Sequence, residues 1–263
     1  MTILDWTEQA FIHFLLVTMR ITGLLTAAPV FQSRNLPSLA RLGIVLFISL
    51  VIAPVIPGTA GVSSLPVLGL LALQEILVGL VMGFMVNMAL AAVQVAGQLI
   101  DVPMGFGMVN VLDPQLGIRM PVIGQLQQII ALWVFLLVDG HHVLLRALVE
   151  SYRLLPVGGT PFFLRGTAVV VKGFSSMFLL GFTIALPIVG VLFLTSIGLG
   201  ILVRLIPQVN VFMVGYPLKI LLGFIMLWLS MAVFCRWFAG YLSGSGEIWR
   251  GLLRLISIIG KGP

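Results

Sequence analysis

Six long apolar segments dominate this chain and leave it few choices of fold. Proline, glycine and asparagine mark the boundaries between them, and a helix needs about 20 apolar residues to cross the roughly 30 Å hydrocarbon core of a bilayer. No segment alternates apolar and polar residues with the period of two that a membrane β-barrel strand requires. We therefore expect an all-α, polytopic membrane protein with long, partly broken helices. The expected spans are residues 9–28, 39–56, 67–99, 122–138, 172–203 and 211–239.

The composition supports a membrane protein and argues against one that binds nucleic acid. Of the 263 residues, 60% are hydrophobic and 8% are charged, whereas a soluble domain carries roughly 25% charged residues. Fourteen Lys and Arg residues oppose eight Asp and Glu residues, and the basic ones are scattered singly. Such charges suit anionic lipid head groups better than a nucleic-acid groove, so we expect membrane lipid and no nucleic acid among the partners. The single cysteine, Cys235, lies in an apolar run and is expected to pack as a small hydrophobic side chain.

Two of the segments are longer than a simple span requires. Residues 67–99 and 172–203 would each extend about 50 Å as straight helices, which exceeds the thickness of the hydrocarbon core. They could be broken in two, at Gly79 and Gly83 or at Pro187, or they could lie partly against protein instead of lipid.

The distribution of basic residues does not give a consistent topology. Arg34 and Arg41 place the first loop in the cytoplasm, and the basic C-terminal tail should also be cytoplasmic, but six simple crossings cannot satisfy both. The loop expected at 139–167, which alternation places outside, contains three arginines. Either some segments are re-entrant or the chain is not a plain bilayer bundle.

A stripe of small and polar residues runs along the long segment 67–99. Most of its members are four residues apart, which places them on one slowly drifting face of a helix. Small residues let helices approach closely in a membrane, and the stripe fits contact with this chain's own helices as well as contact with other subunits. Its ionisable member needs a partner or a wet cavity, because an unpaired carboxylate in hydrocarbon is costly. The members are Glu75, Gly79, Gly83, Asn87, Gln94 and Gln98.

Signatures of enzymes are absent from the sequence. It has no phosphate-binding loop of the form G-x-x-x-x-G-K-[ST], and the GFG at 105–107 is too short for a dinucleotide fingerprint. His141 and His142 are adjacent, so on a helix they would point about 100° apart, which suits a polar cap beside Asp139 better than one shared metal ion. We expect no enzymatic activity, no catalytic residue, no metal ligand and no cofactor.

The break between the third and fourth segments has an unusual composition. Residues 101–117 read DVPMGFGMVNVLDPQLG, which is too rich in proline and glycine for a span and too apolar for an ordinary loop. Taken alone, the stretch fits an interfacial re-entrant loop that joins two helices.

Several phrases taken together resemble one family. The phrases are RITGLLTAAPVFQSRNLPSLARLG (20–43), QEILVGLVMGF (74–84), VAGQLIDVPMGFGMVNVLDPQ (95–115), VDGHHVLLRALVESYRLLP (138–156) and GLGILVRLIPQVNVFMVGYPLK (198–219). Together they resemble FliR, the export-gate component of the flagellar type III secretion system, whose relatives serve virulence injectisomes. The match runs through nearly the whole chain in the family's order.

The resemblance implies an assembly. FliR-like proteins join FliP-like and FliQ-like subunits in a helical complex of homologous-type subunits, which forms the entry of the secretion channel for unfolded proteins. Further export-apparatus proteins such as FlhB are implied as partners. The implied location is the bacterial inner membrane, in the flagellar basal body. Residues 1–171 would correspond to a FliP-like part, and residues 172–263 to a FliQ-like hairpin with a basic tail.

The resemblance also implies a role for the segment at about 104–118, as a plug inside the channel. Glycines at 105, 107 and 117 would supply the backbone freedom to fold a chain into a confined lumen, and apolar side chains would exclude water. Methionine tolerates imperfect fit and would repack when the gate opens. The implied plug residues are Met104, Gly105, Phe106, Gly107, Met108, Val109, Val111, Leu112, Asp113 and Pro114. In the PQVNVF phrase, Pro207, Gln208 and Asn210 predict a turn between two helices.

Two alternatives stay open from the sequence. A secondary transporter of a small solute would show repeated halves and a midplane site with convergent charges, whereas Arg20, Glu75, Lys219 and Arg236 look isolated and no repeat is visible. A membrane scaffold without a pore would tolerate charged substitutions in the apolar loop.

Overall fold

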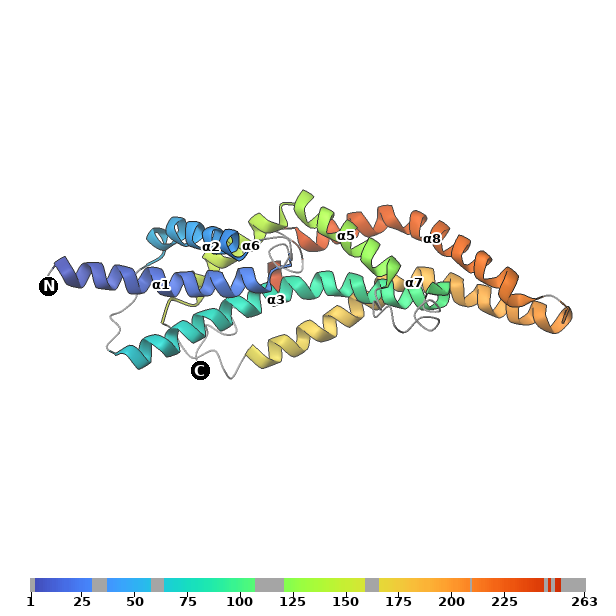
Figure 1. Ribbon diagram of the computed structural model, residues 1–263, viewed down its shortest axis with the longest axis horizontal. Helices are drawn as coiled ribbons and strands as arrows, with labels where there is room; N and C mark the ends of the chain where they lie inside the picture. The colour runs from blue at the N-terminus through green and yellow to red at the C-terminus, as the bar shows by residue number, and fades with distance from the viewer. Residues whose placement is uncertain are drawn as a thin grey trace. The chain divides into compact units, whose positions relative to one another are not determined.

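The computed structural model describes residues 3–29, 37–57, 64–106, 121–158, 166–208, 210–243, 246 and 249–251. Within these ranges the protein is helical, with no strand, so the expected all-α fold is confirmed. In chain order the helices are α1 (Ile3–Ala27), α2 (Ser38–Ile52), α3 (Leu65–Met104), α5 (Val122–Leu137), α6 (Gly140–Leu154), α7 (Gly166–Leu205) and α8 (Val211–Leu242), as labelled in Figure 1. A 3-10 turn, η1 (Ala53–Val55), follows α2.

The helices agree with a polytopic membrane protein. Among the described residues, five helical stretches are long and apolar enough to cross a membrane: 8–27, 38–55, 65–104, 171–205 and 213–242. The predicted span at 122–138 corresponds to α5, which has only 16 residues. It is followed after two residues by α6 at a bend of 64°, and the bent pair could form one further broken span.

The two overlong segments are single helices. Both α3 and α7 contain 40 residues, which corresponds to about 60 Å at 1.5 Å per residue. Of the two alternatives left open by the sequence, breaks at Gly79 and Gly83 or at Pro187 do not occur, whereas packing against protein is seen where Gly79 and Gly83 of α3 meet α1. Pro187 lies inside α7, where it removes one backbone hydrogen bond without ending the helix. Membrane helices tolerate such prolines when neighbouring groups restore the lost bonding.

The chain forms two compact units, and each gathers segments that are far apart in the sequence. Unit 1 comprises Met1–Met88, Val138–Phe174 and Tyr241–Pro263, and unit 2 comprises Ala89–Leu137 and Ser175–Gly240. The division between them passes through α3, α7 and the C-terminal end of α8. It describes contacts within this chain, so the family correspondence expected for residues 1–171 and 172–263 stays a prediction.

In unit 1, the second half of α1 lies in the core. Leu16, Val17 and Ile21 are fully buried, and α2 lies beside α1 (Figure 1). The imidazole Nε2 of His13 lies 3.1 Å from the carbonyl oxygen of Ala53, which connects α1 to η1. The first helix of the chain is therefore a central element of this unit.

Where α1 crosses the first half of α3, the two backbones touch. A Cβ added at Gly79 would clash with the carbonyl oxygen of Arg20, and one added at Gly23 would clash with the carbonyl oxygen of Ile76. Only glycine on both helices permits this approach, which is the small-residue packing typical of membrane helices.

In unit 2, the last part of α3 packs with α5, α7 and α8. Gly97 and Gly124 approach so closely that a Cβ on Gly97 would overlap the backbone of α5. The carboxylate of Asp101 accepts a hydrogen bond from the backbone N–H of Ile123 at 3.1 Å, and so satisfies a donor in the first turn of α5. The buried core consists of Ala96, Ile100, Met104, Ile123, Ala185, Ile188, Leu192 and Leu227.

Large apolar side chains cover the outside of α8 within unit 2. Met213 and Trp228 are each 78% exposed, and Val233 is 64% exposed. Exposed apolar surface of this kind requires lipid or another subunit to cover it.

Candidate functional site

A buried ion pair lies at the centre of unit 1. The Nε of Arg20 on α1 donates a hydrogen bond to Oε2 of Glu75 on α3 at 2.5 Å, and the two side chains are 1% and 2% exposed. The sequence interpretation that these two charges are isolated was wrong, because they pair across 55 residues. A buried charge that finds no partner costs several kcal/mol, and mutual pairing offsets that cost for both groups.

The remaining donors of Arg20 are satisfied by α6 and the segment that follows it. Nη1 donates to Oγ of Ser151 at 3.0 Å, and Nη2 donates to the carbonyl oxygen of Leu155 at 3.1 Å. The guanidinium carbon lies 4.0 Å from the centre of the Tyr152 ring, which is a cation–π contact. Arg20 therefore joins α1 to α3 and α6 at once.

The other members of the network are satisfied as well. Oε1 of Glu75 accepts a hydrogen bond from the backbone N–H of Gly158 at 3.4 Å, and Gly158 has a φ of 82° that favours glycine. The hydroxyl of Tyr152 donates to the carbonyl oxygen of Val17 at 3.3 Å. We refer to Arg20, Glu75, Ser151, Tyr152 and Gly158 as the Arg20 network. Its charges bond to each other, to Ser151 and to backbone groups, so the network holds α1, α3 and α6 together.

The small-residue stripe divides into a buried part and a more accessible part. Glu75, Gly79 and Gly83 are buried, and they face α1 of the same chain. Asn87 and Gln94 are half-buried, and Gln98 is exposed. Contact with the chain's own helices therefore accounts for the first three residues. Contact of the stripe with other subunits stays a prediction.

The start of the predicted plug is fixed to α8 in unit 2. Met104, the last residue of α3, is fully buried, and a Cβ added at Gly223 of α8 would collide with its side chain. Gly105 has a φ of 94°, which ends α3 and turns the chain, and a Cβ added there would collide with the ring of Tyr216. A left-handed φ of this kind favours glycine.

Phe106 follows this turn and lies against α8. Its ring meets the ring of Phe224 edge to face, with centroids 6.3 Å apart and planes at 85°. The other predicted plug residues, Gly107, Met108, Val109, Val111, Leu112, Asp113 and Pro114, lie outside the described residues. The structure therefore places the beginning of the segment, and Met104 belongs to the core of unit 2.

The turn between α7 and α8 contains the residues expected there. Pro207 and Gln208 are exposed and lie in a turn. Oδ1 of Asn210 accepts a hydrogen bond from the backbone N–H of Met213 at 3.3 Å, so Asn210 is the N-cap of α8.

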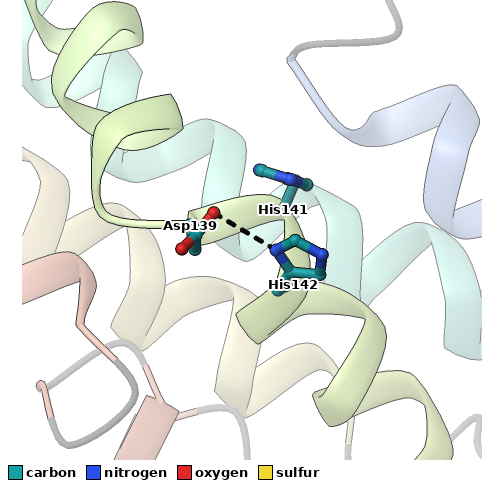
Figure 2. Close-up of side chains that lie close together, drawn as sticks. All are labelled: Asp139, His141 and His142. Carbon is teal, nitrogen blue, oxygen red and sulfur yellow. Dashed lines mark hydrogen bonds and ion pairs between the residues drawn. The ribbon is translucent and has the colours of Figure 1, made fainter.

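Three ionisable side chains gather at the start of α6, as Figure 2 shows. Nδ1 of His142 lies 3.3 Å from Oδ1 of Asp139, and the two histidine rings are 4.3 Å apart. The predicted divergence of His141 and His142 was wrong, because their rings approach each other and His142 also contacts Asp139. Potential ligand atoms of the three residues lie within 4.8 Å of one another. The group lies at a helix N-terminus, where the dipole opposes a cation. The side chain of Asp139 makes no capping hydrogen bond to α6, so the expected polar cap stays a prediction.

These features first define a class: a polytopic, all-helical membrane protein with helices locked by buried charge and glycine contacts. The sequence comparisons then identify the family. A family model described as bacterial export proteins, family 1, matches residues 11–244, so the chain belongs to this family. The resemblance to FliR is thereby confirmed.

Several curated relatives carry the same name. The chain is 38% identical over 252 residues to the flagellar biosynthetic protein FliR of Bacillus subtilis (strain 168), which covers 93% of this chain and 96% of that protein. It is 34% identical over 209 residues to FliR of Escherichia coli (strain K12), with 78% of each chain covered. FliR of Aquifex aeolicus (strain VF5) is 30% identical over 226 residues, with 86% of this chain and 87% of that protein covered.

The sequence contained a signal for part of the Arg20 network. An arginine and a glutamate that each stand alone in apolar segments are expected to find partners in a membrane protein. The sequence offered no signal for Ser151, Tyr152 or Gly158. Ser151 meets Arg20 across 131 residues, Gly158 meets Glu75 across 83 residues, and the contact of Tyr152 depends on where its ring is placed.

Proposed function

We propose that this protein is a subunit of the flagellar type III protein-export gate, which forms and closes the entry of the secretion channel for unfolded flagellar proteins. Membership in the family of bacterial export proteins supports the export role. The name of its relatives, flagellar biosynthetic protein, supports the flagellar assignment. The proposed location is the bacterial inner membrane, in the flagellar basal body, and the long apolar helices suit that location.

The proposed partners are FliP-like and FliQ-like subunits, with FlhB and related export proteins beside them. The exposed apolar side chains of α8 support an assembly, since they leave surface for neighbouring helices. In this proposal residues 1–171 are the FliP-like part, and residues 172–263 are the FliQ-like part. The long helices α7 and α8, joined by the short turn at Pro207 and Gln208, have the form of a helical hairpin. In this proposal the energy for export comes from other components of the export apparatus, so we predict that this chain catalyses no reaction.

The observation that carries the plug proposal is the way α3 ends. A helix of 40 residues stops at Met104, which is locked against Gly223, and the chain turns at Gly105 and holds Phe106 against Phe224. The segment that follows is thus attached at a fixed point and carries a run of apolar side chains in its sequence. An anchored apolar segment is suited to close a narrow passage, because it excludes water without losing its attachment.

Deletion of residues 105–112 tests this proposal. The variant is purified with its export-gate partners, its assembly is checked by co-purification, and its ion conductance is measured in liposomes. We expect a large increase in leak. A matched variant keeps the length of the chain and replaces Met108, Val109, Val111 and Leu112 with Ser, and it should leak as well. Unchanged conductance in an assembled complex would refute the plug.

The Arg20 network argues against the rival role as a small-solute transporter. Arg20 and Glu75 are two charges that could have formed a binding site. They instead pair with each other and form hydrogen bonds to other groups of the same unit. Saturable solute uptake by the isolated chain in liposomes would favour the transporter instead.

A further inference from the structure

A groove between α2 and α6 in unit 1 has no role in the proposed gate. It has a volume of about 600 Å³, and Trp249 closes part of it. One wall is the apolar face of α2, and the other is a face of α6 on which the apolar side chains Leu145 and Val149 lie among charged and polar ones. We propose that this groove binds an anionic phospholipid.

The α2 wall is suited to an acyl chain. Phe47 and Val51 are four residues apart and therefore share one face of α2. They are 69% and 54% exposed, so the rest of unit 1 does not cover them. An acyl chain lying along these side chains would remove apolar surface from contact with water or head groups.

The α6 wall is suited to an anionic head group. Four side chains of this wall recur at helical spacing on one face: His142, Arg146, Glu150 and Arg153. Glu150 is already paired with Arg153 at 3.2 Å, and His142 contacts Asp139. Arg146 is exposed and makes no ion pair or hydrogen bond within the described part of the chain. Arg146 is therefore the arginine of this wall that has no counter-charge within the described part of the chain.

The combination of the two walls selects the ligand. An inorganic phosphate would satisfy Arg146 but leave the α2 wall uncovered, whereas a neutral lipid would cover α2 but leave Arg146 without a counter-charge. An anionic phospholipid provides a phosphate for Arg146 and an acyl chain for Phe47 and Val51 in one molecule. Trp249 adds an indole ring of the kind that sits at the level of lipid head groups. Basic grooves between membrane helices bind anionic lipids in this way.

Lipid binding to the full-length protein, purified in detergent with its co-purifying subunits, tests this proposal. The probes are palmitoyl-oleoyl phosphatidylglycerol and palmitoyl-oleoyl phosphatidylcholine, which share acyl chains and differ in charge, and retained lipid is counted by native mass spectrometry. We expect preferential retention of phosphatidylglycerol. Arg146→Gln should weaken that retention about fivefold, the usual effect of one basic side chain near an anionic head group.

Three variants separate the contribution of the charge from that of the apolar wall. Arg146→Lys keeps the charge and should keep most of the preference. Arg236→Gln removes an exposed arginine of α8 that bonds to its own helix backbone at Ala232, and should leave the preference unchanged. Phe47→Ser should weaken retention of both lipids. Equal retention of the two lipids by the unaltered protein, or the same loss in Arg236→Gln as in Arg146→Gln, would overturn the proposal.

A partner protein in the groove is the competing outcome. Benzoylphenylalanine placed at position 47 and photo-activated in native membranes reports what lies against α2. A mass increase equal to a phospholipid supports the proposal. A cross-link to another polypeptide overturns it. So does the combination of no phospholipid adduct and no preferential retention of phosphatidylglycerol.

Discussion

Replacing Glu75 with glutamine should destabilise the protein strongly, although glutamine has nearly the same shape. The substitution leaves the Arg20 guanidinium fully buried, with its bonds to Ser151 and Leu155 but without its counter-charge. Removing one partner of a buried ion pair costs about 3–5 kcal/mol. The amide oxygen of glutamine can still accept from the backbone N–H of Gly158, so we place Glu75→Gln at the lower end, about 3 kcal/mol.

A loss of this size is a large fraction of the total stability of a protein, which is about 5–15 kcal/mol. The assay is thermal unfolding of the purified protein in detergent, followed by tryptophan fluorescence and by loss of the monodisperse peak in size-exclusion chromatography. The matched control is Glu150→Gln, which removes a carboxylate from an exposed pair with Arg153 and should cost between 0 and about 1 kcal/mol.

A second pair of variants separates the loss of charge balance from the loss of shape. Arg20→Met with Glu75→Leu replaces both charges with apolar groups, so neither member of the pair leaves an unpaired charge in the core. This double variant should be more stable than Glu75→Gln alone, since replacing a whole buried pair is often tolerated better than breaking it. The reasoning is refuted if Glu75→Gln shifts the melting temperature no more than Glu150→Gln.

Two further predictions concern the glycine contacts. Gly79→Ala should cost about 1–3 kcal/mol of stability, because the new methyl group clashes with the carbonyl oxygen of Arg20. The control, Gly69→Ala on the same helix, meets no atom within 4 Å and should be neutral or slightly stabilising. Thermal unfolding compares the two variants, and equal melting temperatures would contradict the close helix contact. Gly223→Ala should displace Met104 and loosen the attachment of the segment after Gly105, which raises the ion conductance of the assembled complex. The control, Gly240→Ala on the same helix, meets no atom within 4 Å and should leave the conductance unchanged. A leak in both variants, or in neither, would count against the attachment.

The local features of the fold could be predicted well from the sequence. The apolar segments at 39–56, 172–203 and 211–239 agree within a few residues at most boundaries with α2 and η1, α7, and α8. The family resemblance, carried by phrases distributed along the chain, is confirmed by the match over residues 11–244. These features depend on neighbouring residues, so no knowledge of distant contacts is needed to find them.

The predictions failed where the outcome depends on what a residue touches. Glycine and proline often break helices. Here Gly79 and Gly83 let α3 approach α1 closely, and α7 continues through Pro187. The region at 139–167 was expected to be a loop, yet Gly140–Leu154 forms α6, and its arginines at 146 and 153 share a face that borders a groove. Likewise α3 continues through Pro103 and ends one residue later, where Gly105 adopts a left-handed φ.

The sequence by itself determined that this chain forms long membrane helices and belongs to the FliR family. The length of each apolar segment and the order of the motifs can be read directly along the chain, without knowing which distant residues meet. Only the tertiary structure decided that Arg20 and Glu75 satisfy each other, that the glycines of the stripe face α1, and that Met104 lies in a core. The physical reason is sequence separation: the bonds of Arg20 close over 55, 131 and 135 residues, and a single buried charge can be satisfied by any group that folding brings to it.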